Sequence, residues 1–485
     1  MGIQCPGYCD PLDQCFRDES ENVAKRAQKS YKASARKDTL SRTKHIHIDW
    51  PSPKSVSVEQ DEDFECQTRA FSNLSHLSQS VEDIAIAHFM LSYIPGSHFD
   101  YLPFLYAQSA SNDLLPAPIR AASIAILSRK VGRADVLDMA RQSYAQALSE
   151  TNASLADPLA ATKDTTLISV LLLGLFEAIA CSDLRTPQSW TAHTRGALAL
   201  INLRGPQQLK SNVGRQLFVQ VANIICVDSI QCKVRLPTEL LELIAVALRY
   251  ESECPKYQLA RLTGEVSILL SDIDEGGLSI KEIIDATRQL DDQYVAFGIS
   301  LVPPWHYQEC DTRTFSLGFC GRKTHNYASH RAAQLWNSCR MTRILLNETI
   351  HSYAIRLGSV SANALQTQAA YNIQQMAVDI CSSITQFKKP VEFSASPGWC
   401  LPSFPMLTVA QPFFPIPLEA STTSLLWPLS VVKSAVLASA DVRAFAIDQL
   451  KTLGRDSHIP QAEEVAMDRN DISALQDGLH MFYVS

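Results

Sequence analysis

The sequence is poor in glycine, and this scarcity excludes the commonest nucleotide-binding motifs. Only 18 of the 485 residues are glycine, and no group of them has the fixed spacing of a P-loop or a Rossmann fingerprint. The Gly-x-Ser-x-Gly elbow of serine hydrolases and the His-Glu-x-x-His motif of zinc proteases are also absent. Aspartate and glutamate together number 50, but no pair stands in a recognisable acid–base arrangement. We therefore expect a protein that is not an enzyme.

An excess of positive charge and a membrane-spanning apolar run are missing as well. The formal net charge is −7, so any contact with DNA must be local. The N-terminus is polar and lacks the apolar segment of a secretory signal. The most apolar run, Leu167–Cys181, is too short to cross a bilayer and contains Glu177. It is predicted to be a buried helix, and no membrane partner is expected.

Cysteine is present in an odd number of scattered copies, thirteen in all. In a long intracellular chain this pattern favours reduced, packed thiols over a disulfide framework. Cys5, Cys9 and Cys15 are spaced C-x3-C-x5-C, whereas a structural zinc site usually combines C-x2-C pairs into four ligands. His45 and His47 add only a weak signal. We interpret the three cysteines as thiols that do not form a zinc site.

Helical periodicity dominates from Val81 onward, and alternation typical of strands is nearly absent. The pattern predicts an all-α fold with helical-hairpin packing and no sheet of more than two short strands. The stretch 390–430, rich in proline and aromatic residues, is predicted to be an irregular connection over the helical core. The predicted helices are 81–94, 116–130, 134–150, 164–182, 187–203, 211–230, 237–249, 256–273, 279–296, 328–356, 364–387 and 438–454.

The chain before residue 81 divides into two parts, and the segment is expected to be disordered or loosely packed. Residues 38–80 have the composition of a linker. Residues 1–37 include a helix predicted over 16–37, apolar on one side and basic on the other. Its basic face could be a solvated surface, a phosphate contact or a nuclear import signal. The basic residues are Lys25, Arg26, Lys29, Lys32, Arg36 and Lys37.

Two adjacent predicted helices, 164–182 and 187–203, form the most apolar part of the chain. The short turn between them predicts an antiparallel pair at the centre of the domain. We expect four of their side chains to be buried: Leu171, Leu175, Trp190 and Ile201. His193 lies on the same face with no obvious carboxylate or nucleophile beside it. We therefore interpret His193 as a structural histidine.

Five segments, in order, resemble the fungal Zn2Cys6 transcription factors. Residues 1–20 contain Cys-Pro-Gly-Tyr, Asp-Pro-Leu-Asp and Phe-Arg-Asp-Glu-Ser, which resemble the exit from a binuclear zinc cluster. Residues 171–177 read Leu-Leu-x-Gly-Leu-Phe-Glu, and 190–201 read Trp-x-x-His-x-x-Gly-Ala-x-x-Leu-Ile. Near the C-terminus follow Leu-Trp-Pro-Leu at 426–429 and Asp-Val-Arg-Ala-Phe at 441–445. The resemblance implies a helical regulatory domain over 81–485.

The same resemblance implies a function and a set of partners. It implies a nuclear protein that controls transcription, often of metabolic genes, together with other regulators or an intact family member. Cys5 would be the sixth cluster ligand, and the five upstream cysteines are not in the sequence. No cofactor is therefore expected in this chain, and zinc only if the missing cluster is restored. Two alternatives remain open: a helical small-molecule-binding protein or enzyme with a pocket between helices 164–230, and a partner protein that does not itself bind DNA.

The chain as written is predicted to bind no zinc tightly and to bind DNA only weakly. Cys5, Cys9 and Cys15 cannot complete two tetrahedral sites, and the metal supplies the folding energy of such clusters. Phosphate contacts from the basic helix would fade steeply as salt rises and would not distinguish sequences. Metal analysis and titrations with two unrelated duplexes at two salt concentrations check this. Stoichiometric zinc, or a sequence preference that survives physiological salt, would contradict it.

Overall fold

The computed structural model confirms the all-α prediction over the part of the chain that it describes. The predicted segment 1–37, with Cys5 and the basic helix, lies outside the described residues, as does the predicted linker 38–80 except for its last residue. The described residues are 80–95, 97–109, 113–180, 188–252, 254–311, 323–388, 422–456 and 459–467.

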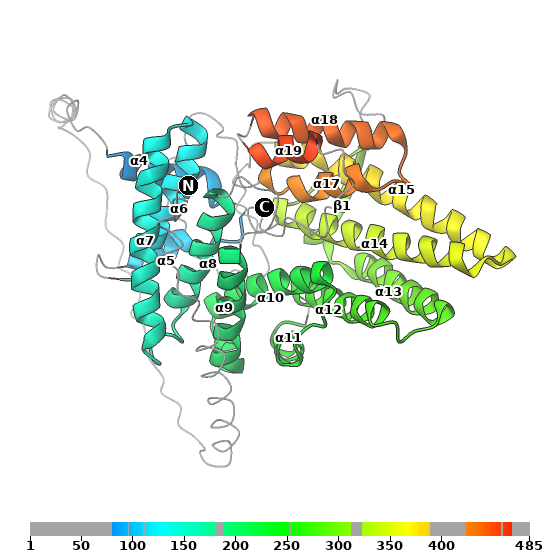
Figure 1. Ribbon diagram of the computed structural model, residues 1–485, viewed down its shortest axis with the longest axis horizontal. Coiled ribbons are helices and arrows are strands. Elements are labelled where there is room, and N and C mark those ends of the chain that lie inside the picture. Colours follow the sequence, from blue (N-terminus) through cyan, green and yellow to red (C-terminus); the bar gives the residue numbers. More distant parts are fainter. Residues whose placement is uncertain are drawn as a thin grey trace, which may run out of the picture.

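The helices form two groups that lie side by side (Figure 1). The first group holds α4 (Val81–His88), the π-helix η1 (Phe89–Tyr93), α5 (Leu102–Gln108), α6 (Pro116–Val131), α7 (Ala134–Ala156), α8 (Asp164–Ala180), α9 (Gln188–Arg204), the 3-10 helix η2 (Gly205–Lys210), α10 (Asn212–Cys232) and α11 (Thr238–Tyr250). The second group holds α12 (Pro255–Asp274), α13 (Ile280–Ser300), the 3-10 helix η3 (Pro303–Trp305), β1 (Tyr307–Asp311), β2 (Lys323–Tyr327), α14 (His330–Leu357), α15 (Val360–Lys388), α17 (Leu426–Ser434), α18 (Ala440–Asp456) and α19 (Pro460–Met467).

Local sequence signals set several helix ends where periodicity alone leaves them uncertain. Ser279 and Glu282 form a capping box at the start of α13, so two backbone N–H groups are satisfied reciprocally. Ser329 caps α14 by accepting from the N–H of Ala332. Gly205, with φ +58°, follows the last residue of α9 in the left-handed conformation that glycine adopts most easily. These caps explain why most predicted ends lie within a few residues of the observed ones.

Helices α8 and α9 are antiparallel neighbours, as predicted. Arg204 at the end of α9 forms an ion pair with Asp164 at the start of α8, which fixes the relative direction of the two helices. All four side chains expected in the core are buried, with exposed fractions of 3% or less: Leu171, Leu175, Trp190 and Ile201. Helix α8 is apolar on nearly every side and is covered by α6, α7, α9 and α10.

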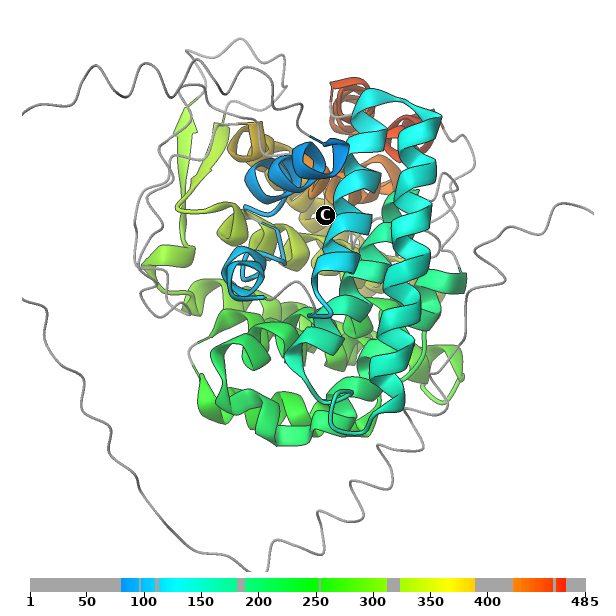
Figure 2. The ribbon, with the colours of Figure 1, turned by 90° about the vertical axis from the view of Figure 1, so that its left-hand side faces the viewer.

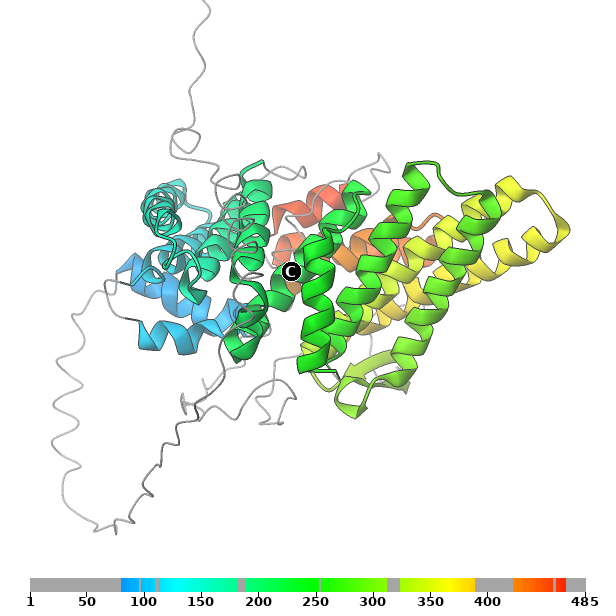
Figure 3. The same ribbon diagram turned by 90° about the horizontal axis from the view of Figure 1, so that it is seen from below.

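Each group of helices has its own hydrophobic core, and the two cores meet at α10 and α12. In the first group, the long helices α6 and α7 pack along each other (Figure 2). In the second group, α13, α14 and α15 project away from the first group (Figure 3). A further tie between the groups is a hydrogen bond of 2.7 Å from Arg129 Nη2 on α6 to Gln461 Oε1 on α19.

The helical hairpin of α14 and α15 forms the frame of the second group. Asn337 donates to Ser383 Oγ at 3.0 Å, and Asn372 donates to Asn347 Oδ1 at 2.9 Å, so the two helices run antiparallel over most of their length. Gly358, with φ +63°, ends α14 and lets the chain turn at once into α15. The hairpin thus supports the prediction of helical-hairpin packing.

Three helices, α5, α17 and α19, and the strands β1 and β2 were not among the predicted elements. Helices α5 and α19 have seven and eight residues, too few to show a clear helical period. The prediction of an irregular connection up to residue 430 is wrong for its last residues, because α17 begins at Leu426. Pro428 is the third residue of α17, where its missing N–H costs nothing. Strands β1 and β2 pair antiparallel as a two-stranded sheet, which stays within the predicted limit.

Trp190→Ala is expected to lower the free energy of unfolding by about 3–5 kcal/mol, because it removes a large side chain that is only 1% exposed. Chemical denaturation of the purified protein measures this change. Leu159→Ala is a suitable control, because Leu159 is 79% exposed and its removal leaves no cavity. Equal stabilities of the two variants would contradict the central position of α9.

Candidate functional site

A cavity of about 130 Å³ lies where the two groups of helices meet. Its wall is formed by residues of α10, α12 and α14, by Trp427 and Pro428 of α17, and by His98 from the segment before α5. One alternative drawn from the sequence was a small-molecule pocket between helices 164–230. The observed cavity agrees with it only in part. Of the helices in that range, α10 alone lines this cavity, and the opposite wall comes from elements more than 100 residues further along the chain.

Most of the cavity wall is apolar. Val219 and Val227 from α10, Leu335 and Met341 from α14, and Trp427 from α17 all contribute to it. An engineered apolar cavity of about 150 Å³ takes up benzene, so the present one has room for roughly one aromatic ring or a short alkyl chain. Asn223, Asn337 and Thr263 supply polar groups along the same wall. The combination is typical of a small-molecule site.

Two cationic residues line the same cavity, each at the start of a long helix. Lys256 is the second residue of α12, and Arg331 is the second residue of α14. Neither helix has an acidic residue in its first turn. The N-terminus of a helix carries a partial positive charge, which an acidic residue usually compensates. The two helix ends and the two side chains therefore combine into a region of positive potential.

One carboxylate balances part of this charge. Asp100 forms an ion pair with Arg331. His98 adds no charge, since burial lowers its pKa to about 3, assisted by the nearby charges of Lys256 and Arg331. That both cations act on the pKa of His98 also indicates that all three lie at the same end of the cavity.

The sequence analysis did not single out His98, Lys256 or Arg331. The feature that marks Lys256 and Arg331 can be recognised only once the helix ends are known. In Cys254-Pro255-Lys256 and in Ser329-His330-Arg331, a cationic residue stands two positions after the N-cap. An acidic residue is usual in this first turn of a helix. Sequence alone does not bring the two helix ends together, because they are 75 residues apart. Packing of α12, α13 and α14 within the second group of helices does so.

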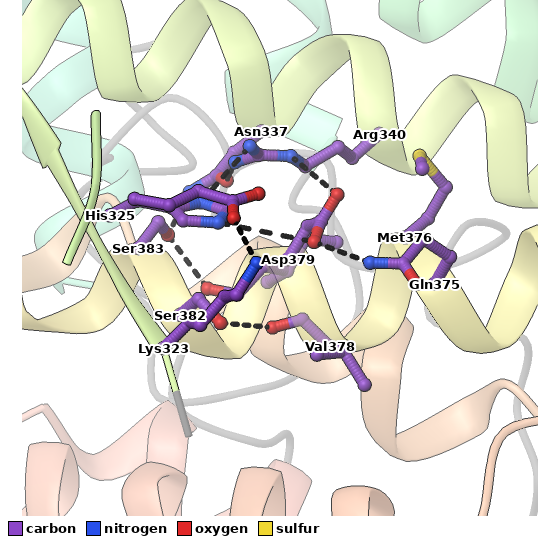
Figure 4. A network of polar contacts seen from close by, with 12 residues as sticks. Lys323, His325, Asn337, Arg340, Gln375, Met376, Val378, Asp379, Ser382 and Ser383 are labelled. Carbon is purple, nitrogen blue, oxygen red and sulfur yellow. Dashed lines mark hydrogen bonds and ion pairs between the residues drawn. The ribbon is translucent and has the colours of Figure 1, made fainter. Parts of the chain in front are cut away.

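A second polar cluster surrounds Arg340 of α14, which is only 2% exposed (Figure 4). Its guanidinium carbon lies 5.0 Å from the ring centre of Tyr307, 5.8 Å from that of Tyr327 and 5.5 Å from that of Trp336. Nη1 donates to the hydroxyl of Tyr327 at 2.6 Å and to Asn337 Oδ1 at 3.1 Å. The aromatic faces and hydrogen bonds hold the buried cation in place.

The Arg340 cluster fastens the β1–β2 hairpin to α14 and α15. Arg340 Nη2 lies 3.2 Å from Nδ1 of His325 on β2, and Arg340 Nε lies 4.0 Å from Asp379 Oδ2 on α15. The backbone N–H of Tyr327 donates to Gln386 Oε1 of α15 at 3.2 Å. The cluster joins three elements and encloses its cation, so we assign it a structural role.

The environment of Arg340 shifts the pKa values of its neighbours. Burial lowers the pKa of His325 to about 3, and the charges of Arg340 and Lys323 act in the same direction. Burial raises the pKa of Asp379, although Arg340 opposes this shift. Burial also raises the pKa of Tyr327 to about 12. A neutral His325 can accept from Arg340 through Nδ1, which a protonated ring could not do.

His193 belongs to a third, smaller network, in which the carboxylate of Glu177 is connected to it through Tyr144. The Tyr144 hydroxyl donates to Glu177 Oε1 at 2.5 Å and lies 3.1 Å from His193 Nε2. The interaction connects α7, α8 and α9, and Tyr144 and His193 are both buried. The structural interpretation of His193 is thus supported by hydrogen bonds inside the helical core.

The basic residues and cysteines singled out near the N-terminus lie outside the described residues, so the structure places none of them. These are Cys5, Lys25, Arg26, Lys29, Lys32, Arg36 and Lys37. Over the described part of the chain, no three His, Cys, Asp or Glu side chains come close enough together to hold a metal ion. None of the described helices is long and apolar enough to span a membrane.

Comparison with known proteins connects the first group of helices with transcription. Residues 104–237 match the fungal specific transcription factor domain, a range that runs from α5 to the residue before α11. An uncharacterized protein of Emericella nidulans is 28% identical over 117 residues, which is 24% of this chain and 24% of that protein. The chain thus aligns with about a quarter of the length of this relative. No solved structure matches. The domain match indicates a regulatory role in transcription.

The His325→Gln variant is expected to change how stability depends on pH. An unfolded histidine titrates near pH 6.5, whereas His325 stays neutral in the fold down to about pH 3. Between these values the unfolded state binds the extra proton, so the wild type loses stability as pH falls. From pH 6.5 to 5.5 this loss is about 1 kcal/mol.

Glutamine does not titrate, so the stability difference between wild type and His325→Gln should shrink by that amount over the same pH range. Urea denaturation of both proteins at several pH values measures the difference. Since all other titrating groups are shared, their effects cancel in the comparison. A difference that stays constant with pH would show that His325 is not held neutral by the Arg340 cluster.

Proposed function

We propose that this chain is a fungal transcription-regulatory protein that acts in the nucleus. The observation that carries the proposal is the match of residues 104–237 to the fungal specific transcription factor domain. In the structure these residues include α6, α7, α8, α9 and α10, which share one hydrophobic core. The matched region is thus most of a packed unit, consistent with a domain that works as a rigid body.

The finer parts of the proposal rest on the sequence resemblance. We propose that the target genes are metabolic and that the chain works with other regulators or with an intact Zn2Cys6 family member. The basic residues between Lys25 and Lys37 would direct import into the nucleus. The 485 residues given would act without a bound metal, and their own contact with DNA would be weak. Sequence-specific binding would come from the partner.

A second candidate function is the binding of a small molecule, and the cavity between the two groups of helices favours it. The two functions are compatible, because a ligand that touches both groups could change how the domain meets its partner. An enzymatic function has no comparable support: among the described residues the cavity wall contains no carboxylate that could serve as a general acid or base.

A tethering experiment tests the proposed function. The full chain is fused to a bacterial operator-binding domain and expressed in a filamentous fungus that carries a reporter with upstream operators. We expect a change in reporter expression of at least several fold that requires the operators. A reporter without operators and the operator-binding domain alone are the controls. An unchanged reporter, with the fusion present at a normal level in the nucleus, would contradict a regulatory role.

The same fusion tests the import segment. When the six basic residues are changed to alanine, the reporter response should be lost, and a heterologous import signal should restore it. Lys281→Ala with Arg288→Ala is the matched control, because both residues are exposed on α13. Their replacement changes the net charge without touching the segment. A response that survives the six changes would show that import depends on another part of the chain.

A further inference from the structure

We propose that the cavity between the two groups of helices binds a small neutral aromatic molecule with one hydroxyl group, a simple phenol. The ring would lie along the apolar part of the wall, and the hydroxyl would lie against Asn223 and His98. This inference names the ligand class for the second candidate function, the binding of a small molecule, and rests on it. It does not depend on the regulation of transcription.

Three hydroxyl groups on the cavity wall are already used within their own helices. Thr263 donates to the carbonyl oxygen of Leu259 at 2.8 Å. Ser338 donates to that of Gln334 at 3.0 Å, and Thr342 to that of Ser338 at 3.0 Å. A hydroxyl has a single proton to donate. These residues therefore present lone pairs and apolar atoms to the cavity, and no donor.

Asn223 and His98 differ from these residues, because neither side chain has a hydrogen-bond partner within the described part of the chain. Both line the cavity and both are half-buried. The amide of Asn223 can donate and accept. His98 is neutral, since burial lowers its pKa to about 3, so one ring nitrogen donates and the other accepts. A polar group with little access to water is costly when unpaired, so a ligand that bonds to these side chains gains affinity.

The two unpaired side chains lie at the same end of the cavity. Tyr101, three residues after His98, donates to Gln220 Oε1 of α10 at 3.0 Å. Gln220 lies three residues before Asn223 on the same helix, so this bond holds the segment of His98 against the turn that carries Asn223. A hydroxyl is the smallest group that donates to one of these side chains and accepts from the other.

The ligand needs no charge to bind in this place. Lys256 and Arg331 also lie near His98, but each has interactions of its own, in the case of Arg331 with Asp100. The polar group of the ligand is therefore matched to the neutral Asn223 and His98. A phenol stays neutral at pH 7, because a phenolic hydroxyl has a pKa of about 10.

The rest of the cavity is apolar and has the size of one ring. Its volume of about 130 Å³ is close to that of an engineered cavity of about 150 Å³ that takes up benzene. Val227 of α10, Met341 and Leu345 of α14 and Trp427 of α17 contribute to this part of the wall. Trp427 is only 2% exposed, so packing fixes its position before any ligand enters. A ring in this place would contact both groups of helices.

Titration of the purified full chain with phenol and with benzene tests the inference. The two probes are nearly the same size, and only phenol forms conventional hydrogen bonds. A cavity without unpaired polar groups would favour benzene, because burying an unpaired hydroxyl is costly. We expect the opposite order, with phenol at least about threefold tighter than benzene. Calorimetry in sealed cells should give a dissociation constant for phenol below about 1 mM.

Two variants locate the hydroxyl group. Asn223→Leu and His98→Leu each remove polar atoms and leave an apolar side chain. The preference for phenol over benzene should fall by about threefold or more in each variant, because a hydrogen bond is lost. Benzene should still bind, which shows that the fold and the cavity are kept. Asn363→Leu is the matched control, because Asn363 is exposed on α15 and should leave the preference unchanged.

A third variant locates the ring. Val227→Phe should weaken the binding of both probes by filling the cavity, whereas Val295→Phe adds the same volume on α13, at a residue that does not line it. Thermal unfolding shows whether each variant keeps its fold. If Val227→Phe fails to fold, Asn223→Leu decides the case.

The outcomes separate this inference from the functions proposed above. A preference for phenol that depends on Asn223 or His98 supports the inference. If benzene binds as tightly as phenol, or if both leucine variants keep the preference, the inference is overturned and the second candidate function stands. If neither probe binds at about 10 mM, the two fail together. A silent tethered reporter with intact phenol binding would contradict the regulatory role alone.

Discussion

The packing of α10 against α12 is the interaction on which the rest of the molecule depends, because each helix contributes to both hydrophobic cores. Helix α10 places Leu217 and Phe218 in the first core and Ile230 in the second. Helix α12 does the same, with Tyr257 in the first core and Val266 in the second. Without this pair, each core would expose an apolar side to water. The connection between the groups is therefore a continuation of the core rather than a polar interface.

The same junction contains the cavity. A dry void of about 130 Å³ would cost roughly 3 kcal/mol, by the cavity cost seen when large core residues are removed. Such a void would destabilise the packing of α10 and α12, the two helices that join the cores. A ligand that fills the space would remove this cost and would contact helices of both groups.

How much the sequence could predict depends on the range of the interactions. The helices followed from local information: the Ser279–Glu282 capping box and the periodic apolar faces are visible within a few residues. The burial of Trp190 followed from the same pattern. The β1–β2 hairpin could not be predicted, because its strands have only five residues each and dock through Arg340. An arginine within a helical pattern looks like a solvated surface residue until the aromatic rings that cover it are known.

The candidate site could not be predicted from the sequence, for a related reason. Lys256 and Arg331 acquire a meaning only when α12 and α14 begin beside the same cavity, and neither residue belongs to a motif. Arg340, the buried cation of the second cluster, shows by contrast what a cation with a structural role looks like. Arg340 is enclosed by three aromatic rings and bonded to Tyr327 and Asn337. Lys256 and Arg331 instead line a cavity with a mostly apolar wall, and Arg331 also forms an ion pair with Asp100. A place on the wall of a cavity, more than burial, separates these two cations from the structural one.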